Sequence, residues 1–243
     1  MRFKPLDKLV RRMAEYYWYY GASDSWRAIF SLLERNDGAS LLDLGCGDGS
    51  STTLVAERIR ASKVYGIDLD EENVMRARER GVLAYSSDLN EKFPFEDESI
   101  DVVFANQVIE HLIDVDNFVS EIYRVLKRGG YAIICTENLA SWHNIFALLL
   151  GNQPYSGPQV SVKHVIGHHP LHPQMDSGKA GNPYLKHNTV MAFKALKEIF
   201  RVYGFKIEKV IGSGYYPFPK LLGRVLCRLD KAHAHFLTLK VRK

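Results

Sequence analysis

The chain has few cysteines and no long apolar run. Three cysteines give no disulfide framework, so a reducing, cytoplasmic location is expected. No apolar stretch of signal-peptide length follows the basic start Met-Arg-Phe-Lys-Pro, and the apolar run from Ile145 to Leu150 is far too short to span a bilayer. These absences argue against a disulfide-rich secreted domain and a membrane-spanning protein, and they favour a soluble one.

Size and charge give the next limits. With 243 residues and 46% apolar content, the chain can bury one core, so one domain with an insertion is expected rather than two domains. From Val160 to the end there are 15 Lys and Arg against 4 Asp and Glu, a net +11, which leaves −7 for the rest. Either the basic half meets an anionic substrate or surface, or its charges only solvate outer helices.

Strand and helix patterns alternate along most of the chain. Regular alternation implies right-handed crossovers and an α/β fold, Rossmann-like and doubly wound, with a mostly parallel sheet and helices on both faces. The helix at 116–127 is expected to stop at Arg128-Gly129-Gly130. The patterns predict strands at 40–44, 63–68, 82–86, 100–106, 131–136, 206–211 and 235–241, and helices at 13–34 (one or two), 51–60, 71–80, 116–127, 189–203 and 219–230.

The segment 138–188 interrupts this alternation. It holds five of the nine prolines and shows no clean period, which is typical of a lid inserted after the fifth strand. The expected organisation is an N-terminal helical cap at 1–39, a core domain at 40–137 and 189–243, and the inserted substrate lid at 138–188.

A glycine-rich loop follows the first predicted strand. Gly45, Gly47 and Gly49 alternate with other residues, so the backbone can turn sharply and approach a ligand without a Cβ in the way. A dinucleotide site reads Gly-x-Gly-x-x-Gly, whereas here the third glycine comes one residue early. We place the Asp43 carboxylate at the mouth of this loop, where acids, Asp48 included, suit a cationic ligand better than a phosphate.

The sequence Asp-x-Gly-x-Gly-x-Gly resembles the first motif of the class I S-adenosylmethionine-dependent methyltransferases, and the resemblance extends from Leu41 to Ile134. It implies a seven-stranded sheet with an antiparallel last strand, and S-adenosylmethionine as the cofactor. Its cofactor contacts would come from the glycine loop and from the ends of the next three strands. In this chain those residues are Asp43, Gly45, Cys46, Gly47, Gly49, Asp68, Leu69, Asp88, Leu89, Asn106 and Gln107.

The expected roles of these residues differ. Asp68 ends the second strand 19 residues after Gly49, where an acid is placed to accept both ribose hydroxyl protons. The alternatives for Asp68 are a solvated strand end or a helix N-cap, although Asp70 is already a good capping candidate. By the resemblance, Asp88 accepts a hydrogen bond from the adenine amino group and Leu89 packs on the ring. Backbone carbonyls at Asn106 and Gln107 would hold the cofactor's ammonium.

His111 is the candidate general base. It follows the fourth strand, beside the expected methyl position, and a base is needed when the acceptor is a hydroxyl or a protonated amine. The alternative is a histidine that caps or packs against the next helix. The segment also resembles ubiquinone-pathway O-methyltransferases, in which Glu-x-x-Glu-His can hold a divalent metal. Here Gln107 replaces the first glutamate, and hard cations prefer charged oxygen ligands, so no metal is predicted.

Histidines are frequent in the predicted lid. Their spacing could suit zinc on a helix, but two prolines argue against a helix and no cysteine accompanies them. With Lys163 and Lys186 they are better explained as contacts to an anionic or hydroxyl-rich acceptor. They are His143, His164, His168, His169, His172 and His187.

The segment 219–230 predicts a short basic amphipathic helix. An apolar stripe of leucine and valine runs beside Lys220, Arg224 and Arg228, which recur every four residues. Such a helix can make peripheral contact with an anionic membrane, or its stripe can pack on the domain's own core. Both interpretations stay open.

These observations favour a methyltransferase that acts on oxygen of a small molecule, lipid or glycan, by in-line displacement. The alternatives are an RNA or protein methyltransferase, suggested by the basic second half, and a binding module that keeps the pocket without catalysis. Nucleic acid is disfavoured, because Asn106-Gln107 stands where RNA cytosine methyltransferases have Pro-Cys. An NAD-dependent dehydrogenase is a third alternative, against which the early third glycine counts.

Overall fold

The computed structural model describes residues 5–161, 163–164, 166–168 and 186–243. Strands and helices alternate from residue 40 to residue 137, and the chain then returns to the sheet with its last two strands. The elements, in order, are α1 (Pro5–Leu32), β1 (Ser40–Leu44), α2 (Ser50–Ile59), β2 (Lys63–Asp68), α3 (Glu71–Glu79), β3 (Leu83–Ser86), β4 (Ile100–Asn106), the 3-10 helix η1 (Ile109–His111), α4 (Val115–Val125), β5 (Leu126–Glu137), α5 (Trp142–Leu149), α6 (Phe193–Val202), β6 (Lys206–Ser213), α7 (Lys220–Leu229), the 3-10 helix η4 (Lys231–His233) and β7 (Phe236–Arg242).

The seven strands form one sheet in the order β3-β2-β1-β4-β5-β7-β6. The first five strands are parallel, and β7 runs antiparallel to both of its neighbours, β5 and β6. The strand order reverses between β1 and β4, whose carboxyl ends therefore open the crevice in which doubly wound sheets bind ligands. This confirms the expected fold class, including the antiparallel last strand.

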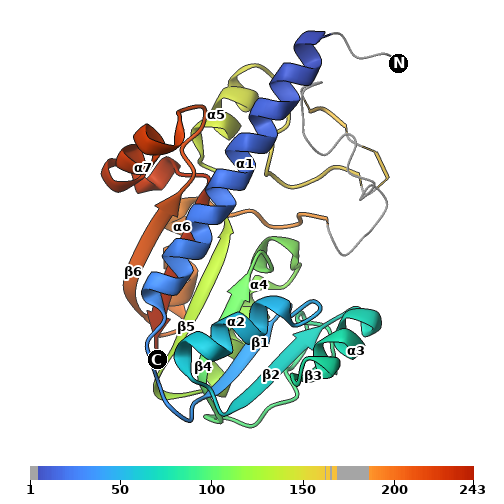
Figure 1. The fold of residues 1–243 in the computed structure, drawn as a ribbon, viewed down its shortest axis with the longest axis vertical. Coiled ribbons are helices and arrows are strands. Elements are labelled where there is room, and N and C mark those ends of the chain that lie inside the picture. The colour runs from blue at the N-terminus through green and yellow to red at the C-terminus, as the bar shows by residue number, and fades with distance from the viewer. Residues whose placement is uncertain (1–4, 162, 165, 169–185) are drawn as a thin grey trace.

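Helices cover both faces of the sheet (Figure 1). In β1, Leu41 packs with α1 and α2 in one buried cluster, while Leu42 and Leu44 pack with α4 and α6 in the other. This alternation follows from the two-residue period of a strand. Residues Ile29 and Leu32 of α1 belong to the first cluster, so the carboxyl-terminal part of this helix is built into the core.

Several boundaries differ from the sequence predictions: α1 begins at Pro5, not at residue 13, α6 begins at Phe193, not at residue 189, and the largest change in the sheet lies between α4 and β5. Helix α4 ends at Val125, and Arg128-Gly129-Gly130 lies inside β5 instead of closing the helix. The strand is irregular there: its register with β4 shifts between Ile100 and Val102, and Gly129 has a φ of 80°. The two glycines therefore permit an irregularity in a strand, a role that they also commonly take.

The segment 138–188 begins with a helix that the sequence analysis missed. Helix α5 follows Asn138, which is fully buried and whose side-chain amide donates to the carbonyls of Ala232 and Ala234, both at 2.8 Å. The Asn144 amide donates to Ser156 Oγ at 2.9 Å. Buried polar contacts thus fix the start of this segment to the core domain.

Most of the apolar stripe of α7 does not pack on the core; within it, the half-buried Leu226 packs against the buried cluster of Tyr215, Cys227 and Ala234. Only Gly223 and Cys227 of this helix are buried, while Leu221 and Leu229 are 78% and 79% exposed. The structure therefore contradicts the interpretation in which the stripe completes the domain's own core.

Candidate active site at the carboxyl ends of the strands

The glycine loop joins β1 to α2. The amides of Gly45 and Cys46 both donate to the Ile67 carbonyl, at 2.8 and 2.9 Å, so the loop is fixed to the end of β2. Gly45 has a φ of 75°, and a Cβ there would lie 2.5 Å from Val108 Cγ2. Gly47 also has a positive φ, 53°, but a Cβ there would meet nothing within 4 Å. The loop is therefore tight at Gly45 and open at Gly47, while Cys46 is buried.

Asp68 holds this loop from the end of β2. One carboxylate oxygen accepts the Gly47 amide at 2.8 Å, and the other accepts the Asp70 amide at 3.0 Å. The N-cap of α3 is Asp70, whose side chain accepts from the Glu72 and Asn73 amides. The N-cap alternative for Asp68 is therefore wrong, and its carboxylate lies directly beside the open glycine.

The other two acids of the loop are placed differently from the prediction. Asp43 is 2% exposed and accepts a hydrogen bond from Thr52 Oγ1 at 2.6 Å, so it lies beneath the loop, not at its mouth. Burial raises the pKa of Asp43 to about 7, with a further contribution from the nearby Asp68. Asp48 forms an ion pair with Arg80 at 3.1 Å, which neutralises the acid at the surface.

The other residues predicted to contact the adenosine follow β2 and β3. Leu69 is 42% exposed, so its side chain is available to a ligand. Asp88 is half-buried, and one of its oxygens accepts both the backbone and side-chain N–H groups of Asn90 at 2.8 Å. Leu89 is 7% exposed and belongs to the core cluster of α4 and α6.

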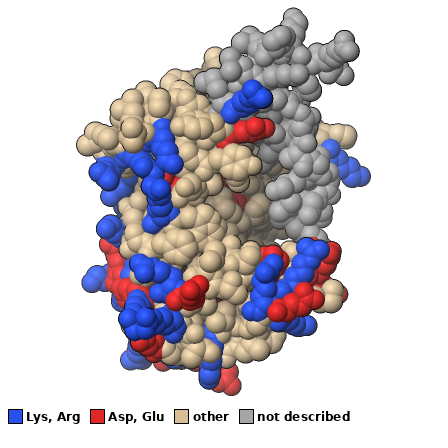
Figure 2. All heavy atoms as spheres, viewed as in Figure 1, with Lys and Arg blue, Asp and Glu red and all other residues tan. Residues whose placement is uncertain are grey.

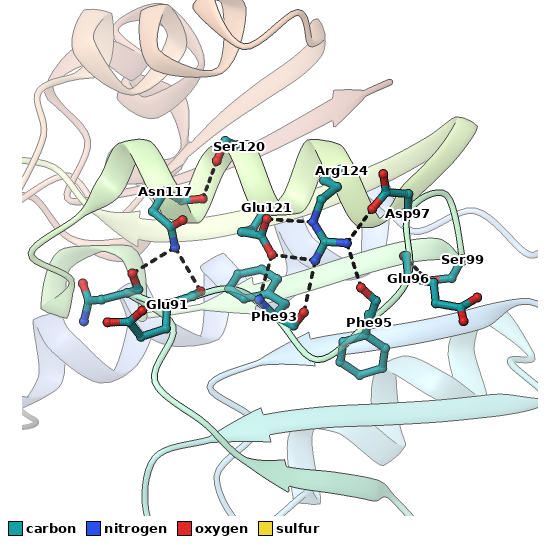
Figure 3. Close-up of polar contacts among 11 residues, drawn as sticks. Glu91, Phe93, Phe95, Glu96, Asp97, Ser99, Asn117, Ser120, Glu121 and Arg124 are labelled. Carbon is teal, nitrogen blue, oxygen red and sulfur yellow. Dashed lines mark hydrogen bonds and ion pairs between the residues drawn. The ribbon is translucent and has the colours of Figure 1, made fainter.

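The loop that leads into β4 is fastened by Arg124 (Figure 3). This side chain reaches from α4 to the carbonyls of Phe93 and Phe95, at 3.1 and 2.7 Å, and pairs with Glu121 and Asp97. Glu121 in turn accepts the Phe93 amide at 2.7 Å. The two carboxylates raise the pKa of the Arg124 guanidinium above its usual value. This network fixes the segment between Asp88 and β4.

Gln107 directly follows β4, and its backbone conformation is strained. Its φ is 58°, a left-handed value that non-glycine residues rarely adopt. The backbone N–H of Gln107 donates to the Cys135 carbonyl of β5 at 2.8 Å, which holds the turn. Asn106 and Gln107 are both half-buried at the same sheet edge as the glycine loop.

His111 lies at the end of η1 and is half-buried. Its Nδ1 is 3.1 Å from the Lys186 carbonyl, and because a carbonyl only accepts, Nδ1 donates this hydrogen bond. The next helix, α4, is capped by Asp114, so the capping alternative for His111 is wrong. The Asn188 side chain donates to the His111 carbonyl at 2.7 Å. Lys186 and Asn188, where the chain returns to the core domain, thus fix the position of this histidine.

A buried polar cluster adjoins His111, and most of it was not predicted. Glu110 is 1% exposed and accepts from Thr136 Oγ1 at 2.8 Å, while its other oxygen, Oε1, has no hydrogen-bond partner in the described structure. His187 Nδ1 is 3.4 Å from Glu137 Oε2, and the His187 ring lies 5.0 Å from that of His111. Burial raises the pKa of Glu110 to about 7 and that of Glu137 well above its usual value.

His235 completes the cluster just before β7. It is 5% exposed, its Nε2 is 3.9 Å from Glu137 Oε1, and burial lowers its pKa well below the usual value. The signal for Glu137 was its place at the carboxyl end of a buried strand. His235 gave no such signal, because it reaches this edge only through the antiparallel pairing of β7 with β5.

The other histidines are divided. His143 has its pKa lowered to about 3 by burial, and its ring lies 4.8 Å from that of His235. His169 and His172 lie outside the described residues. Among the residues that the structure describes, no three His, Cys, Asp or Glu side chains are grouped to hold a metal ion. That this site binds no metal therefore stays a prediction.

Comparison with known proteins agrees with this arrangement. A family model described as a methyltransferase domain matches residues 42–134. A Mycolicibacterium smegmatis protein named "Probable S-adenosylmethionine-dependent methyltransferase" is 43% identical over 109 residues, 44% of this chain and 41% of that one. Residues 42–134 of this chain thus match the methyltransferase-domain family and are similar to S-adenosylmethionine-dependent methyltransferases. The match begins at the second residue of β1 and ends in β5, so this domain contains the glycine loop, Asp68 and His111.

Two further proteins resemble the methyltransferase domain or the whole fold. A trans-aconitate 2-methyltransferase of Azoarcus is 36% identical over 118 residues, 46% of each chain. The crystal structure of an S-adenosylmethionine-dependent methyltransferase from Mesorhizobium loti superposes with a TM-score of 0.61 at 21% identity, over 90% of this chain and 97% of that one. The sequence matches span about half the length of these two sequence relatives, 41% and 46%.

Proposed function

We propose that the chain transfers the methyl group of S-adenosylmethionine to an oxygen atom of a small acceptor, with His111 as the general base. The observation that supports this most is the common location of three features. The glycine loop, Asp68 and His111 follow β1, β2 and β4, which are parallel neighbours whose carboxyl ends meet at one edge. This common edge supports a cofactor and an acceptor bound next to each other.

The chain's residues fit this cofactor. The open side of Gly47 gives a ligand access to the backbone, and Asp68, beside it, offers carboxylate oxygens to ribose hydroxyls. Asp43 beneath the loop adds a second carboxylate near a cofactor that carries a sulfonium and an ammonium. When bound, S-adenosylmethionine supplies a methyl group on an activated leaving group, suited to in-line displacement.

The chain's own part in the reaction is to place the acceptor and remove its proton. His111 is suited to the second task, because it is an imidazole at the edge where the strands end and the Lys186 carbonyl orients its ring through Nδ1. His187 contacts the His111 ring and lies beside Glu137, so this pair positions the base.

The acceptor that fits best is a small anion. The Azoarcus relative is named for trans-aconitate, a small tricarboxylate, and here the His187 ring and the Lys186 carbonyl contact the proposed base in a part of the chain with an excess of Lys and Arg. Lipids and glycans that carry acidic groups belong to the same class. In this proposal the segment 138–188 serves as the substrate lid on the core domain formed by 40–137 and 189–243, into which the carboxyl-terminal part of α1 is also built.

Replacing His111 tests the proposal. With S-adenosylmethionine and a panel of small carboxylates and hydroxy acids, release of S-adenosylhomocysteine is measured for the wild type and His111→Asn. We expect kcat to fall by about 10² to 10⁴ in the variant, with cofactor affinity unchanged. His233→Asn, on a histidine held by Asp230 beside α7, is the matched control and keeps full turnover. Equal turnover of the wild type and His111→Asn would refute the role of the base.

The salt dependence of acceptor affinity distinguishes an RNA acceptor from a small anion. Binding to nucleic acid weakens steeply with salt, because phosphate contacts release counterions. Acceptor affinity that falls many-fold between 50 and 200 mM salt would favour RNA over a small anion. Cofactor binding without turnover on any acceptor class would favour a non-catalytic module.

A further inference from the structure

Helix α7 presents three different faces to its surroundings. Gly223 and Cys227 point inward, and a Cβ on Gly223 would lie 2.9 Å from the Tyr20 hydroxyl, so the helix packs closely on α1. The outward face is apolar. Its exposed fractions are 78% for Leu221, 47% for Leu222, 50% for Val225 and 79% for Leu229. This arrangement is unusual, since large apolar side chains grouped on a surface mark an interaction site.

The third face of α7 is basic and borders a pocket. Lys220, Arg224 and Arg228 follow one another at four-residue intervals, beside the apolar face. The pocket, of about 540 Å³, lies between α1, β6 and α7, and the cations Arg27, Lys209, Arg228 and Lys231 contribute to its lining. Its one acid, Asp24, is already paired with Arg224 at 2.7 Å. Figure 2 shows Lys and Arg side chains gathered over this part of the molecule, beside uncharged surface.

Helix α5 extends the apolar surface at the same end of the molecule (Figure 1). Its Trp142 packs against the buried cluster of Tyr215, Cys227 and Ala234. The indole N–H of Trp142 also donates to the Tyr215 hydroxyl at 2.6 Å, which fixes α5 next to α7. The second half of α5 and the residue after it are exposed. The exposed fractions are 54% for Phe146, 53% for Leu148, 75% for Leu149 and 75% for Leu150.

We propose that α7 and α5 dock this protein on the surface of an anionic phospholipid bilayer. The exposed side chains of both helices enter the boundary between headgroups and acyl chains, and the basic pocket receives a lipid phosphate. A helix with an apolar face, a basic flank and no acid on either lies in the plane of such an interface. No described helix is long and apolar enough to cross a membrane, so the contact is peripheral.

The charge pattern selects this occupant over a second copy of the chain. A self-complementary contact would bring the basic edges of two α7 helices together, and like charges oppose such a contact. An anionic bilayer instead attracts each basic residue near its surface, and accepts apolar side chains directly behind the headgroups. The proposal is independent of the methyl-transfer activity, because none of these residues lies at the proposed active site.

Vesicle flotation tests the proposal on the whole chain. The probe is a phosphatidylcholine vesicle with or without about 30% phosphatidylglycerol, and the apolar variant is Leu221→Gln with Leu229→Gln. Its matched control is Ile113→Gln with Val202→Gln, two side chains that are each 79% exposed but lie on other elements. A second variant, Arg228→Ala with Lys231→Ala, has Arg58→Ala with Lys63→Ala as its control.

We expect the wild type and both controls to float with the anionic vesicles, and less at high salt because of screening. Each basic residue near such a surface contributes a factor of about five, so the Arg228 and Lys231 variant binds roughly 30-fold more weakly. The apolar variant loses flotation while keeping the far-ultraviolet circular dichroism of the wild type. Equal flotation with neutral vesicles, no flotation, or a wild-type dimer that the apolar variant abolishes would each overturn the proposal.

Discussion

At the scale of single residues, Glu110 shows how burial connects structure with pH. Its carboxyl is 1% exposed, and Thr136 supplies a hydrogen bond to only one of its oxygens. Burial disfavours the charged form and raises the pKa to about 7. Between the unfolded pKa near 4.3 and this folded value, the native state binds the proton and the unfolded state does not.

The sign of the resulting pH dependence follows from that difference. The contribution of Glu110 to stability is fully present below the unfolded pKa and is lost as pH rises through about 7. Glu110→Gln removes this titration, since the amide has no charge to desolvate. We therefore expect the variant to gain stability relative to the wild type on going from pH 4.5 to pH 8, by on the order of 3 kcal/mol.

Urea denaturation of both proteins at the two pH values measures this gain. Glu96→Gln, at an exposed position, is the control and should show no pH-dependent difference from the wild type. A Glu110→Gln difference that is the same at pH 4.5 and pH 8 would contradict the buried, proton-binding state of this carboxyl.

At the scale of elements, the glycine loop makes a prediction that separates strain from ligand contact. Gly47 and Gly38 both have positive φ values, 53° and 85°, and a Cβ on either would meet nothing within 4 Å. Gly47→Ala and Gly38→Ala should therefore each destabilise the fold by about 1–2 kcal/mol through backbone strain alone. Only Gly47→Ala should weaken cofactor binding, by tenfold or more, because its Cβ enters the proposed ligand site.

Thermal unfolding and cofactor titration of the two variants decide the point. Similar losses of stability with a loss of affinity at Gly47 alone would support a loop that meets the cofactor. Equal cofactor affinity in both variants would show that the open side of Gly47 does not face a ligand.

The same elements show how far the sequence determines the fold. Strands β1, β2 and β4 were predicted with their observed bounds, because each is a short and mostly apolar run between polar or glycine-rich segments. The end of α4 was wrong, because a glycine pair permits a strand irregularity as readily as a helix stop. Helix α5 was missed, because its neighbourhood of prolines hides a short helix that is fixed by tertiary contacts of Asn138 and Trp142.

At the candidate site, the sequence correctly predicted which residues lie at the carboxyl ends of the parallel strands. Asp68 and His111 lie where their strands end, as expected. Asp43 was misplaced, since alternation in β1 directs its side chain beneath α2, where Thr52 binds it. The partnership of Glu137 with His187 and His235 joins three distant segments, and no local pattern specifies such a contact.

At the scale of the whole molecule, the structure shows where the excess positive charge of the second half of the sequence lies. Of the positive charges that follow residue 160, several lie on α7, η4 and β6, around the pocket beside α7. The glycine loop, with its acids, lies at the ends of β1 and β2, in the acidic first part of the chain. The fold thus separates the glycine loop and its carboxylates, the proposed cofactor site, from the basic surface around the pocket beside α7.

The central claim is that the glycine loop and Asp68 bind S-adenosylmethionine. Calorimetric titration of this cofactor into the wild type, Asp68→Asn and the exposed control Asp37→Asn tests it most directly. Asparagine can still accept the Gly47 amide but lacks the charge and the second acceptor oxygen. We predict binding by the wild type and Asp37→Asn, and affinity at least tenfold weaker in Asp68→Asn. Equal affinity in all three proteins, or no binding by the wild type, would contradict the account.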